Sequence, residues 1–440
     1  MTLVLIASVI VFNSAALANV ISISSGLATP VMEAGIPQNA YIRVALMGFE
    51  MDEGFKRPPL NVAIVLDQSG SMAGDKIARA REAAIMAVGK LSGDDVVSIV
   101  TYDSTVNVLI PATKVSDKNK IYTAINTIAP RGGTALFAGT SKGAYEVRKF
   151  LSHKSVNRVV LLSDGLANVG PDSPSELGAL GKALAKDGMT VSTIGLGLGY
   201  NEDLMTELVD YSDGSHDFVE NSADLVRIFD REFGDAMSVV AQGVEIEVVF
   251  DESIRPIRII GREGEIIGNR VFTRMNQLYS AQENYVVLEV ALPAQQVGQR
   301  LQVAKVNVQY NNMASNKRLR LSDQVFITFT ASKQQVIDAI NTPIYEAAIE
   351  QIANEETEKA LELRDNGDVR GAAELLKNNS SFLQLAADLI SSPKLQRQSR
   401  QSLYEAAAIE KQEDWNKTRK TLKEKSYKRA KQQEKDEGDR

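Results

Sequence analysis

The sequence predicts an α/β fold with a doubly wound, mostly parallel sheet, together with an all-β domain and a helical C-terminal segment. Three observations predict it. Short Val-, Ile- and Leu-rich runs alternate with amphipathic helical patterns over residues 60–235, the polarity then alternates residue by residue to 332, and the rest of the chain is rich in Ala, Glu, Lys, Leu and Gln. Parallel strands covered on both faces read as continuous apolar runs, whereas antiparallel strands with one solvated face alternate. A chain of 440 residues is long enough for two or three domains.

The first predicted domain spans residues 60–235. Its predicted strands are Asn61–Asp67, Asp95–Tyr102, Arg158–Ser163 and Thr190–Gly195. Its predicted helices are Lys76–Leu91, Lys118–Ile128, Phe137–Leu151, Pro174–Lys186, Glu202–Tyr211 and Ala223–Phe233. The start of one helix is well marked, because Ser173-Pro174-Ser175-Glu176 is a capping box with proline at the first helical position. This alternation of strands and helices indicates a doubly wound sheet.

A β-sandwich-like domain is predicted over residues 236–332. Its strand-like runs are Val244–Phe250, Ile254–Gly261, Tyr285–Leu292, Leu301–Tyr310 and Gln324–Thr330. They are separated by Gly, Asn, Pro and Gln, which is typical of connected antiparallel strands. An earlier segment, Ala40–Leu46, alternates in the same way. We therefore expect residues 19–59 to supply a strand that pairs with this domain, which makes the domain discontinuous.

The C-terminal part is predicted to be helical. Over residues 333–410, Ile344, Ile349 and Ile352 lie close to one helical stripe, and Asn366-Gly367-Asp368 interrupts the pattern before a second helix, which favours helical hairpins. Residues 411–440 are strongly charged, with little to bury besides the single tryptophan. We expect a solvated, charged helix that frays into a disordered tail, and the alternative is a basic helix that binds a partner.

The N-terminus predicts export. Residues 3–12 are apolar and are followed by Ala16-Leu17-Ala18, a small-x-small pattern typical of signal-peptide cleavage. We therefore expect a signal peptide over residues 1–18 and a protein that is secreted or lies in the periplasm or cell envelope. The alternative is an uncleaved membrane anchor, although the apolar run is shorter than the roughly 20 residues that span a bilayer.

The composition excludes several classes of function. A net charge of -7 lacks the basic footprint of a nucleic-acid-binding protein. The chain has no cysteine and two histidines, His153 and His216, so any metal must be held by oxygen atoms. The glycine-rich stretch 195–200 has Tyr200 at the third glycine position of a dinucleotide-binding loop, so we expect a strand-to-helix turn there. No nucleophile with a matched base is visible, and we expect no enzyme.

Oxygen ligands gather where predicted strands end. Asp67-x-Ser69-x-Ser71 follows the first strand of the α/β domain, Asp164 follows the strand that ends at Ser163, and Thr134 lies in a loop after two glycines. Ligands of open α/β sheets bind outside the carboxyl ends of the strands, and Mg²⁺ prefers oxygen ligands. We therefore predict a site for Mg²⁺, with Mn²⁺ or Ca²⁺ as alternatives, at Asp67, Ser69, Ser71, Thr134 and Asp164.

These segments, in this order, resemble the metal-ion-dependent adhesion site of the von Willebrand factor type A family over about residues 60–233. The resemblance implies that Mg²⁺ or Mn²⁺ lies on the upper face of the domain and that an acidic residue of a protein partner completes its coordination. The β-domain, with its preceding strand, is similar to secreted bacterial proteins of this family and, more loosely, to inter-alpha-trypsin-inhibitor heavy chains. The expected function is thus metal-dependent protein binding. The alternative is a structural scaffold of an envelope or extracellular complex, with a metal site that is only structural.

Overall fold

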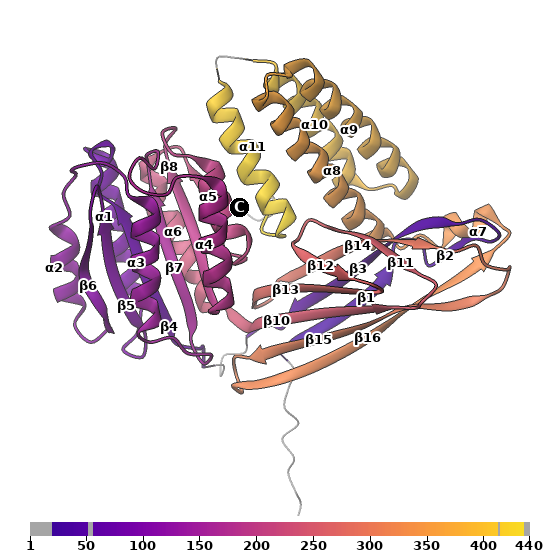
Figure 1. Ribbon diagram of the computed structural model, residues 1–440, viewed down its shortest axis with the longest axis horizontal. Helices are drawn as coiled ribbons and strands as arrows, with labels where there is room; N and C mark the ends of the chain where they lie inside the picture. The colour runs from indigo at the N-terminus through magenta and orange to yellow at the C-terminus, as the bar shows by residue number, and fades with distance from the viewer. Residues whose placement is uncertain (1–19, 52–55, 412–413, 435–440) are drawn as a thin grey trace, which may run out of the picture.

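The computed structural model describes residues 20–51, 56–411 and 414–434. Figure 1 shows an α/β domain, a β-sandwich and a helical bundle, with the last helix, α11, lying between the bundle and the α/β domain. The expected signal peptide, residues 1–18, lies outside the described residues. Within the described part of the chain, no helix is both long and apolar enough to cross a membrane.

The α/β domain is built on a six-stranded sheet in the order β6-β5-β4-β7-β8-β9. Neighbouring strands are parallel except for β6, which runs antiparallel to β5. The strands are β4 Leu60–Asp67, β5 Val96–Tyr102, β6 Val106–Lys114, β7 Val156–Ser163, β8 Met189–Leu196 and β9 His216–Val219. The four central strands are buried along their whole length, which confirms the predicted doubly wound fold. The edge strand β6 escaped prediction because most of its residues are not buried and it carries no continuous apolar run.

Helices cover both faces of this sheet. Helices α1, α2 and α6 pack on one face, and α3, α4 and α5 pack on the other. They are α1 Asp75–Lys90, α2 Lys118–Asn126, α3 Leu136–Arg148, α4 Pro174–Lys186, α5 Glu202–Asp210 and α6 Leu225–Met237, with short 3-10 turns at Gly70–Met72 and Ser222–Asp224. The capping box that the sequence places before α4 is formed, because Ser173 and Glu176 each bond the other's backbone N–H.

The β-sandwich consists of two sheets with one apolar core between them. Their strand orders are β1-β3-β14-β11 and β12-β13-β10-β15-β16-β2. The strands are β1 Ile21–Leu27, β2 Val31–Glu33, β3 Gln38–Gly48, β10 Val239–Phe250, β11 Arg255–Ile260, β12 Gly264–Ile267, β13 Arg270–Tyr279, β14 Glu283–Leu292, β15 Arg300–Asn312 and β16 Lys317–Thr330. Strand β3 precedes the α/β domain in sequence yet pairs antiparallel with β14, which follows that domain. The α/β domain is therefore inserted between strands of the sandwich.

Helices α8, α9 and α10 form a bundle beside the sandwich, and α7 lies against β2 and β16 at the far end of the sandwich (Figure 1). The C-terminal helices are α7 Lys333–Asp338, α8 Thr342–Asp365, α9 Val369–Ile390, α10 Pro393–Ile409 and α11 Trp415–Ala430. Ala347 and Ala348 of α8 pack on Val287 of β14, which attaches the bundle to the sandwich. The long helices α8, α9 and α10 share two small apolar clusters of their own.

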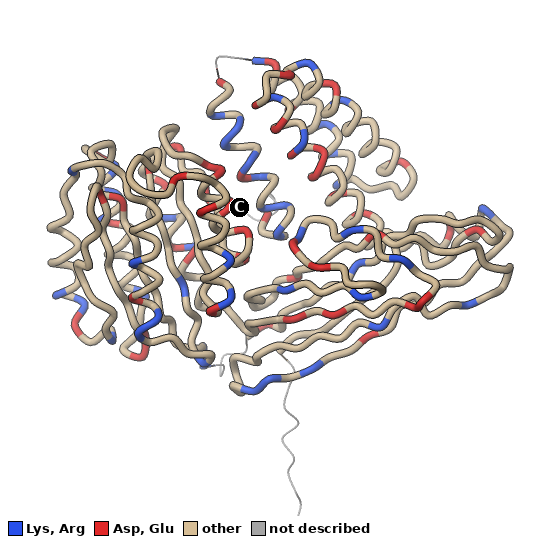
Figure 2. The backbone as a smooth tube through the Cα atoms, viewed as in Figure 1, with Lys and Arg blue, Asp and Glu red and all other residues tan. Residues whose placement is uncertain are grey.

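Helix α11 corrects one expectation. It is not a solvated helix, because Lys420, Leu422, Ser426 and Tyr427 are buried. Figure 2 shows lysines and arginines along α11 where it faces acidic residues of the α/β domain. The expectation was wrong because a charged composition predicts solvation only when the helix has no partner. Here the partners are carboxylates and carbonyls about 200 residues earlier in the chain, which local composition cannot reveal.

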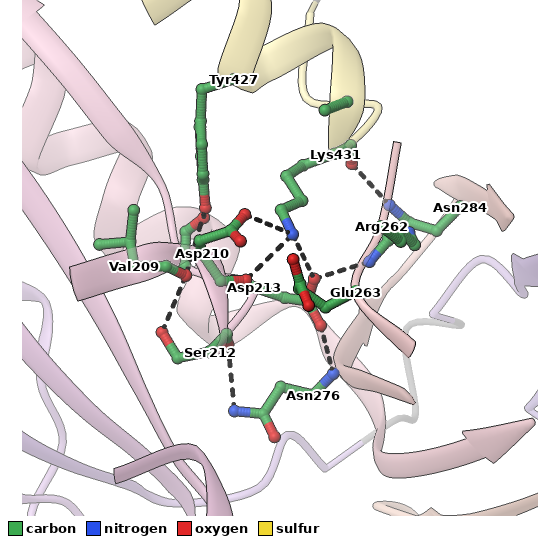
Figure 3. Close-up of polar contacts among 12 residues, drawn as sticks. Val209, Asp210, Ser212, Asp213, Arg262, Glu263, Asn276, Asn284, Tyr427 and Lys431 are labelled. Carbon is green, nitrogen blue, oxygen red and sulfur yellow. Dashed lines mark hydrogen bonds and ion pairs between the residues drawn. The ribbon is translucent and has the colours of Figure 1, made fainter. Parts of the chain in front are cut away.

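The end of α11 meets both other domains at a polar cluster that we call the junction, formed by Asp210, Asp213, Arg262, Asn276 and Lys431 (Figure 3). Lys431 Nζ lies 2.9 Å from Asp210 Oδ1, and Arg262 Nη1 lies 2.6 Å from Asp213 Oδ1. The backbone N–H of Asn276 donates to Asp213 Oδ2 at 2.8 Å. Since Arg262 and Asn276 belong to the sandwich, these contacts fix α11, the sandwich and the α/β domain against one another.

Candidate metal centre

The predicted ligands converge at the carboxyl end of the central sheet. Asp67 is the last residue of β4, and Asp164 follows the last residue of its parallel neighbour β7. Both side chains are buried. Thr134 lies two residues before α3 and is also buried. We call this group, with Ser69 and Ser71, the metal face.

The hydroxyl groups of the metal face lie beside the carboxylates. Ser71 Oγ donates to Asp164 Oδ1 at 2.6 Å and lies 2.9 Å from Ser69 Oγ. A Cβ atom placed on Gly165 would lie 3.2 Å from Thr134 Oγ1 and 3.3 Å from Ser71 Oγ. The glycine after Asp164 therefore leaves room for hydroxyls from two different loops to approach the same point.

Asp67 is buried among neutral donors. Its Oδ1 accepts the backbone N–H of Ser69 at 2.7 Å, and its Oδ2 accepts the hydroxyl of Ser163 at 2.7 Å. Burial raises the pKa of Asp67, and the hydrogen bonds from Ser69 and Ser163 offset only part of that rise. The nearby charge of Asp164 raises the pKa further. A cation beside Asp67 would offset both the cost of burying its charge and the repulsion from Asp164.

Lys76 is a contact that the sequence reasoning missed. It lies in the first turn of α1, and its Nζ is 2.5 Å from Asp164 Oδ2. The lysine side chain is only half-buried, so its ammonium group can reach water while its aliphatic stem stays packed. The sequence places Lys76 only five residues after Ser71, which is close to the predicted ligands. A lysine at the start of a helix is so common, however, that this position alone does not indicate a role at the site.

Polar contacts from the end of β5 hold the loop that carries Thr134. Asp103 Oδ2 accepts from Arg131 Nε at 2.7 Å and from Gln68 Nε2 at 2.6 Å, which connects this loop to the one after β4. Burial would raise the pKa of Asp103, but the hydrogen bonds from Arg131, Thr105 and Gln68 outweigh it and lower the pKa to about 2. Asp103 thus stays ionised and keeps both loops in place.

The side chains of the metal face fit a hard divalent cation. They offer two carboxylates and three hydroxyls, all oxygen, which is the chemistry that Mg²⁺ takes up in proteins. In residues 20–51, 56–411 and 414–434 no cluster of three or more histidine or acidic side chains is placed to hold a metal. Binding at this face would accordingly depend on hydroxyl oxygens as well as on Asp67 and Asp164, with Lys76 withdrawn from Asp164.

Two apolar side chains stand exposed at the rim of the metal face. Leu166, two residues after Asp164, is 59% exposed, and Leu198, in the loop after β8, is 45% exposed. The loop of Leu198 touches the site, since a Cβ atom on Gly199 would lie 2.7 Å from the carbonyl oxygen of Asp164. The rim is therefore partly apolar around a charged centre.

Comparisons with known proteins match the α/β domain to one family. The von Willebrand factor type A domain family matches residues 61–231. An uncharacterized Synechocystis protein, sll0103, is 26% identical over 368 residues, covering 81% of this chain and 86% of that protein. Human inter-alpha-trypsin inhibitor heavy chain H3 is 28% identical, but the match covers only 29% of this chain and 15% of that protein. A solved von Willebrand factor type A structure from Catenulispora acidiphila shares the fold, with a TM-score of 0.69, 13% identity and 88% of each chain covered.

Proposed function

Because residues 61–231 form a von Willebrand factor type A domain, a type that generally serves metal-dependent protein interaction, we propose that this chain binds a protein partner through Mg²⁺. A carboxylate of the partner would complete the coordination of the ion. The proposed ligands, direct or through water, are Asp67, Ser69, Ser71, Thr134 and Asp164.

The observation that carries this proposal is the charge at the end of β4 and β7. Two buried carboxylates, Asp67 at the end of β4 and Asp164 just after β7, accept hydroxyl and N–H donors, and Asp164 also pairs with the half-buried Lys76. The charge of Asp164 contributes to the raised pKa of Asp67, and a cation between the two carboxylates would offset that repulsion. Mg²⁺ supplies that cation, and when hydroxyls provide much of its coordination it keeps positive charge with which to attract an external carboxylate.

The exposed rim favours a protein as the partner. Leu166 and Leu198 present apolar surface next to the proposed ion. Protein interfaces place apolar anchors around a few buried polar contacts, whereas a lone small anion would leave both leucines in water. The partner we propose therefore offers an acidic residue with apolar neighbours, and no nucleic acid is involved.

We propose a binding protein and not an enzyme. His216 is wholly buried, and burial lowers its pKa to about 3, so it stays neutral and is unavailable as a base at the surface. Its Nδ1 lies 2.9 Å from Thr193 Oγ1 inside the domain. We also propose that the protein is secreted or lies in the cell envelope, in keeping with the expected signal peptide.

Partner capture tests this function. Immobilised wild type, Asp67→Asn and the control Asp187→Asn are exposed to the extracellular or envelope fraction of the native host, in Mg²⁺ or in EDTA. Asp187 is a partly exposed residue paired with Arg148 away from the metal face, so its replacement changes charge equally and leaves the site intact. We expect capture by wild type and Asp187→Asn in Mg²⁺ only, and none by Asp67→Asn. Equal capture by all three proteins in EDTA would favour the structural scaffold instead.

A further inference from the structure

We propose that Lys420 of α11 is a positioning residue for the metal face, because it holds the loop between β8 and α5 against Asp164. This inference rests on the proposed metal site. It gives the C-terminal helix a part in ion and partner binding that the family match, which ends at residue 231, does not include.

The loop of residues 197–201 runs beside the backbone of Asp164 and the ammonium group of Lys76 at the outer side of the metal face. A Cβ atom on Gly199 would lie 2.7 Å from the carbonyl oxygen of Asp164, and one on Gly197 would lie 3.7 Å from Lys76 Nζ. Gly197 has a φ of +74°, a conformation that L residues rarely adopt. The loop is thus shaped to run close to the backbone of Asp164, and a shift of the loop would be felt there.

The end of this loop is fixed by packing within the α/β domain. The ring of Tyr200 covers Gly195 so closely that a Cβ atom there would lie 2.1 Å from a ring carbon. The next residue, Asn201, caps α5 by accepting the backbone N–H groups of Asp203 and Leu204. The backbone between Leu198 and Tyr200 remains to be fixed, and the carbonyl groups of these two residues face α11.

Helix α11 binds those carbonyl groups. Lys420 is only 1% exposed, and its Nζ donates to the carbonyl oxygen of Tyr200 at 2.6 Å. The same ammonium group pairs with Glu202 and lies 4.2 Å from the centre of the Tyr200 ring. Asn416, one helical turn earlier, donates from Nδ2 to the carbonyl oxygen of Leu198 at 3.1 Å. Lys420 and Asn416 of α11 therefore hold the loop that carries Leu198, one of the two exposed leucines of the rim, from outside the α/β domain.

Burying the ammonium group of Lys420 costs desolvation free energy. An apolar side chain could attach α11 to the α/β domain without that cost. What lysine adds is a directed bond to one backbone carbonyl. Arg419, its neighbour, connects the same loop end to the bundle, because Nη2 lies 2.8 Å from Asp203 Oδ2 and 2.7 Å from Asp365 Oδ2. A movement of the bundle would therefore shift the loop beside the metal face. By thermodynamic linkage, binding of the ion or of the partner would in turn favour the arrangement in which α11 contacts this loop.

The test is a calorimetric titration of the full chain with Mg²⁺, repeated with Mn²⁺. Lys420→Met removes the buried ammonium group but keeps an unbranched side chain. Lys417→Met is the matched control on the same helix, because the Lys417–Glu220 pair, 2.6 Å apart, lies at the surface. Asn416→Ala removes the second, exposed tether and leaves the buried contacts of α11 in place. Hydrogen exchange over residues 197–201 reports in each protein whether the loop is released.

We expect Lys420→Met to weaken Mg²⁺ binding about fivefold to tenfold, Asn416→Ala to weaken it about twofold, and Lys417→Met to leave it unchanged, since a loosened loop loses preorganisation. Faster exchange over residues 197–201 should accompany the loss. If the loop is released in Lys420→Met and Asn416→Ala while Mg²⁺ binds as in the wild type, the positioning role is wrong and the metal site stands. If the wild type itself binds neither ion, the proposed function fails first.

Discussion

The metal face and the junction both gather aspartates of the α/β domain, but different groups surround their carboxylates. At the junction, Asp213 and Asp210 are paired with Arg262 and Lys431, which come from other parts of the chain. At the metal face, Asp67 receives only neutral donors, and the cation beside Asp164 is Lys76, which is only half-buried. Carboxylates with buried protein cations hold domains together, whereas carboxylates with neutral donors keep a charge that an ion can neutralise. The surroundings, and not the burial, distinguish the two roles.

The largest effect we expect is on stability at the junction. Asp213→Asn keeps the side-chain shape and tolerates the positive φ of +50° at this position, but it removes the charge opposite Arg262. The buried guanidinium is left without its carboxylate, which should cost about 2–3 kcal/mol of unfolding free energy. Urea unfolding of the full chain measures it. A loss below about 0.5 kcal/mol would show that the junction charges do not hold the domains together.

The pH dependence of stability probes the core beneath α11. His216 lies between Tyr200 and Tyr427, a residue of α11, and burial lowers its pKa to about 3. The unfolded chain takes up a proton below about pH 6.5, whereas the folded chain does so only near pH 3, so this contribution is lost as the pH falls between these values. We expect His216 to account for about 2 kcal/mol of the stability lost between pH 7 and pH 5.

The measurement is urea unfolding of the wild type and His216→Asn at both pH values. Asparagine can keep a hydrogen bond to Thr193 but does not titrate. The variant should lose less stability on acidification than the wild type. Identical losses in the two proteins would mean that His216 becomes protonated in the folded chain, and that α11 does not seal this part of the core.

At the metal face the same kind of substitution should act in the opposite direction. Asp67→Asn keeps the acceptor for Ser69 and removes a buried charge whose pKa is raised by burial. In EDTA, this variant should unfold within about 1 kcal/mol of the wild type, on the stabilising side. Thermal unfolding in EDTA at pH 7 measures it. A loss comparable to that of Asp213→Asn would make Asp67 a structural residue and would remove the contrast between the two clusters.

The five proposed ligands could be found from the sequence because each lies at a strand end or beside glycine, so a local motif and the rule for parallel sheets suffice to bring them together. The partner cation Lys76 and the loop support from Asp103 could not be found, because charged residues at a helix start or a strand end have many ordinary roles. The role of Lys420 could not be predicted from the sequence, for a different reason. Its partners, Tyr200 and Glu202, lie more than 200 residues away, and only the folded chain brings them into contact.

The central claim is that the carboxylates of the metal face bind a divalent cation, and calorimetric titration of the full chain with Mg²⁺ tests it most directly. Wild type, Asp67→Asn and Asp187→Asn are titrated after EDTA treatment and dialysis, and their melting temperatures are recorded in the same buffers. We expect one ion per chain for the wild type and Asp187→Asn, with stabilisation of about 2.7 kcal/mol at a hundredfold excess over the dissociation constant. We expect neither heat nor stabilisation for Asp67→Asn. Binding of Mg²⁺ by Asp67→Asn as tight as that of the wild type, or no binding by the wild type, would contradict the claim.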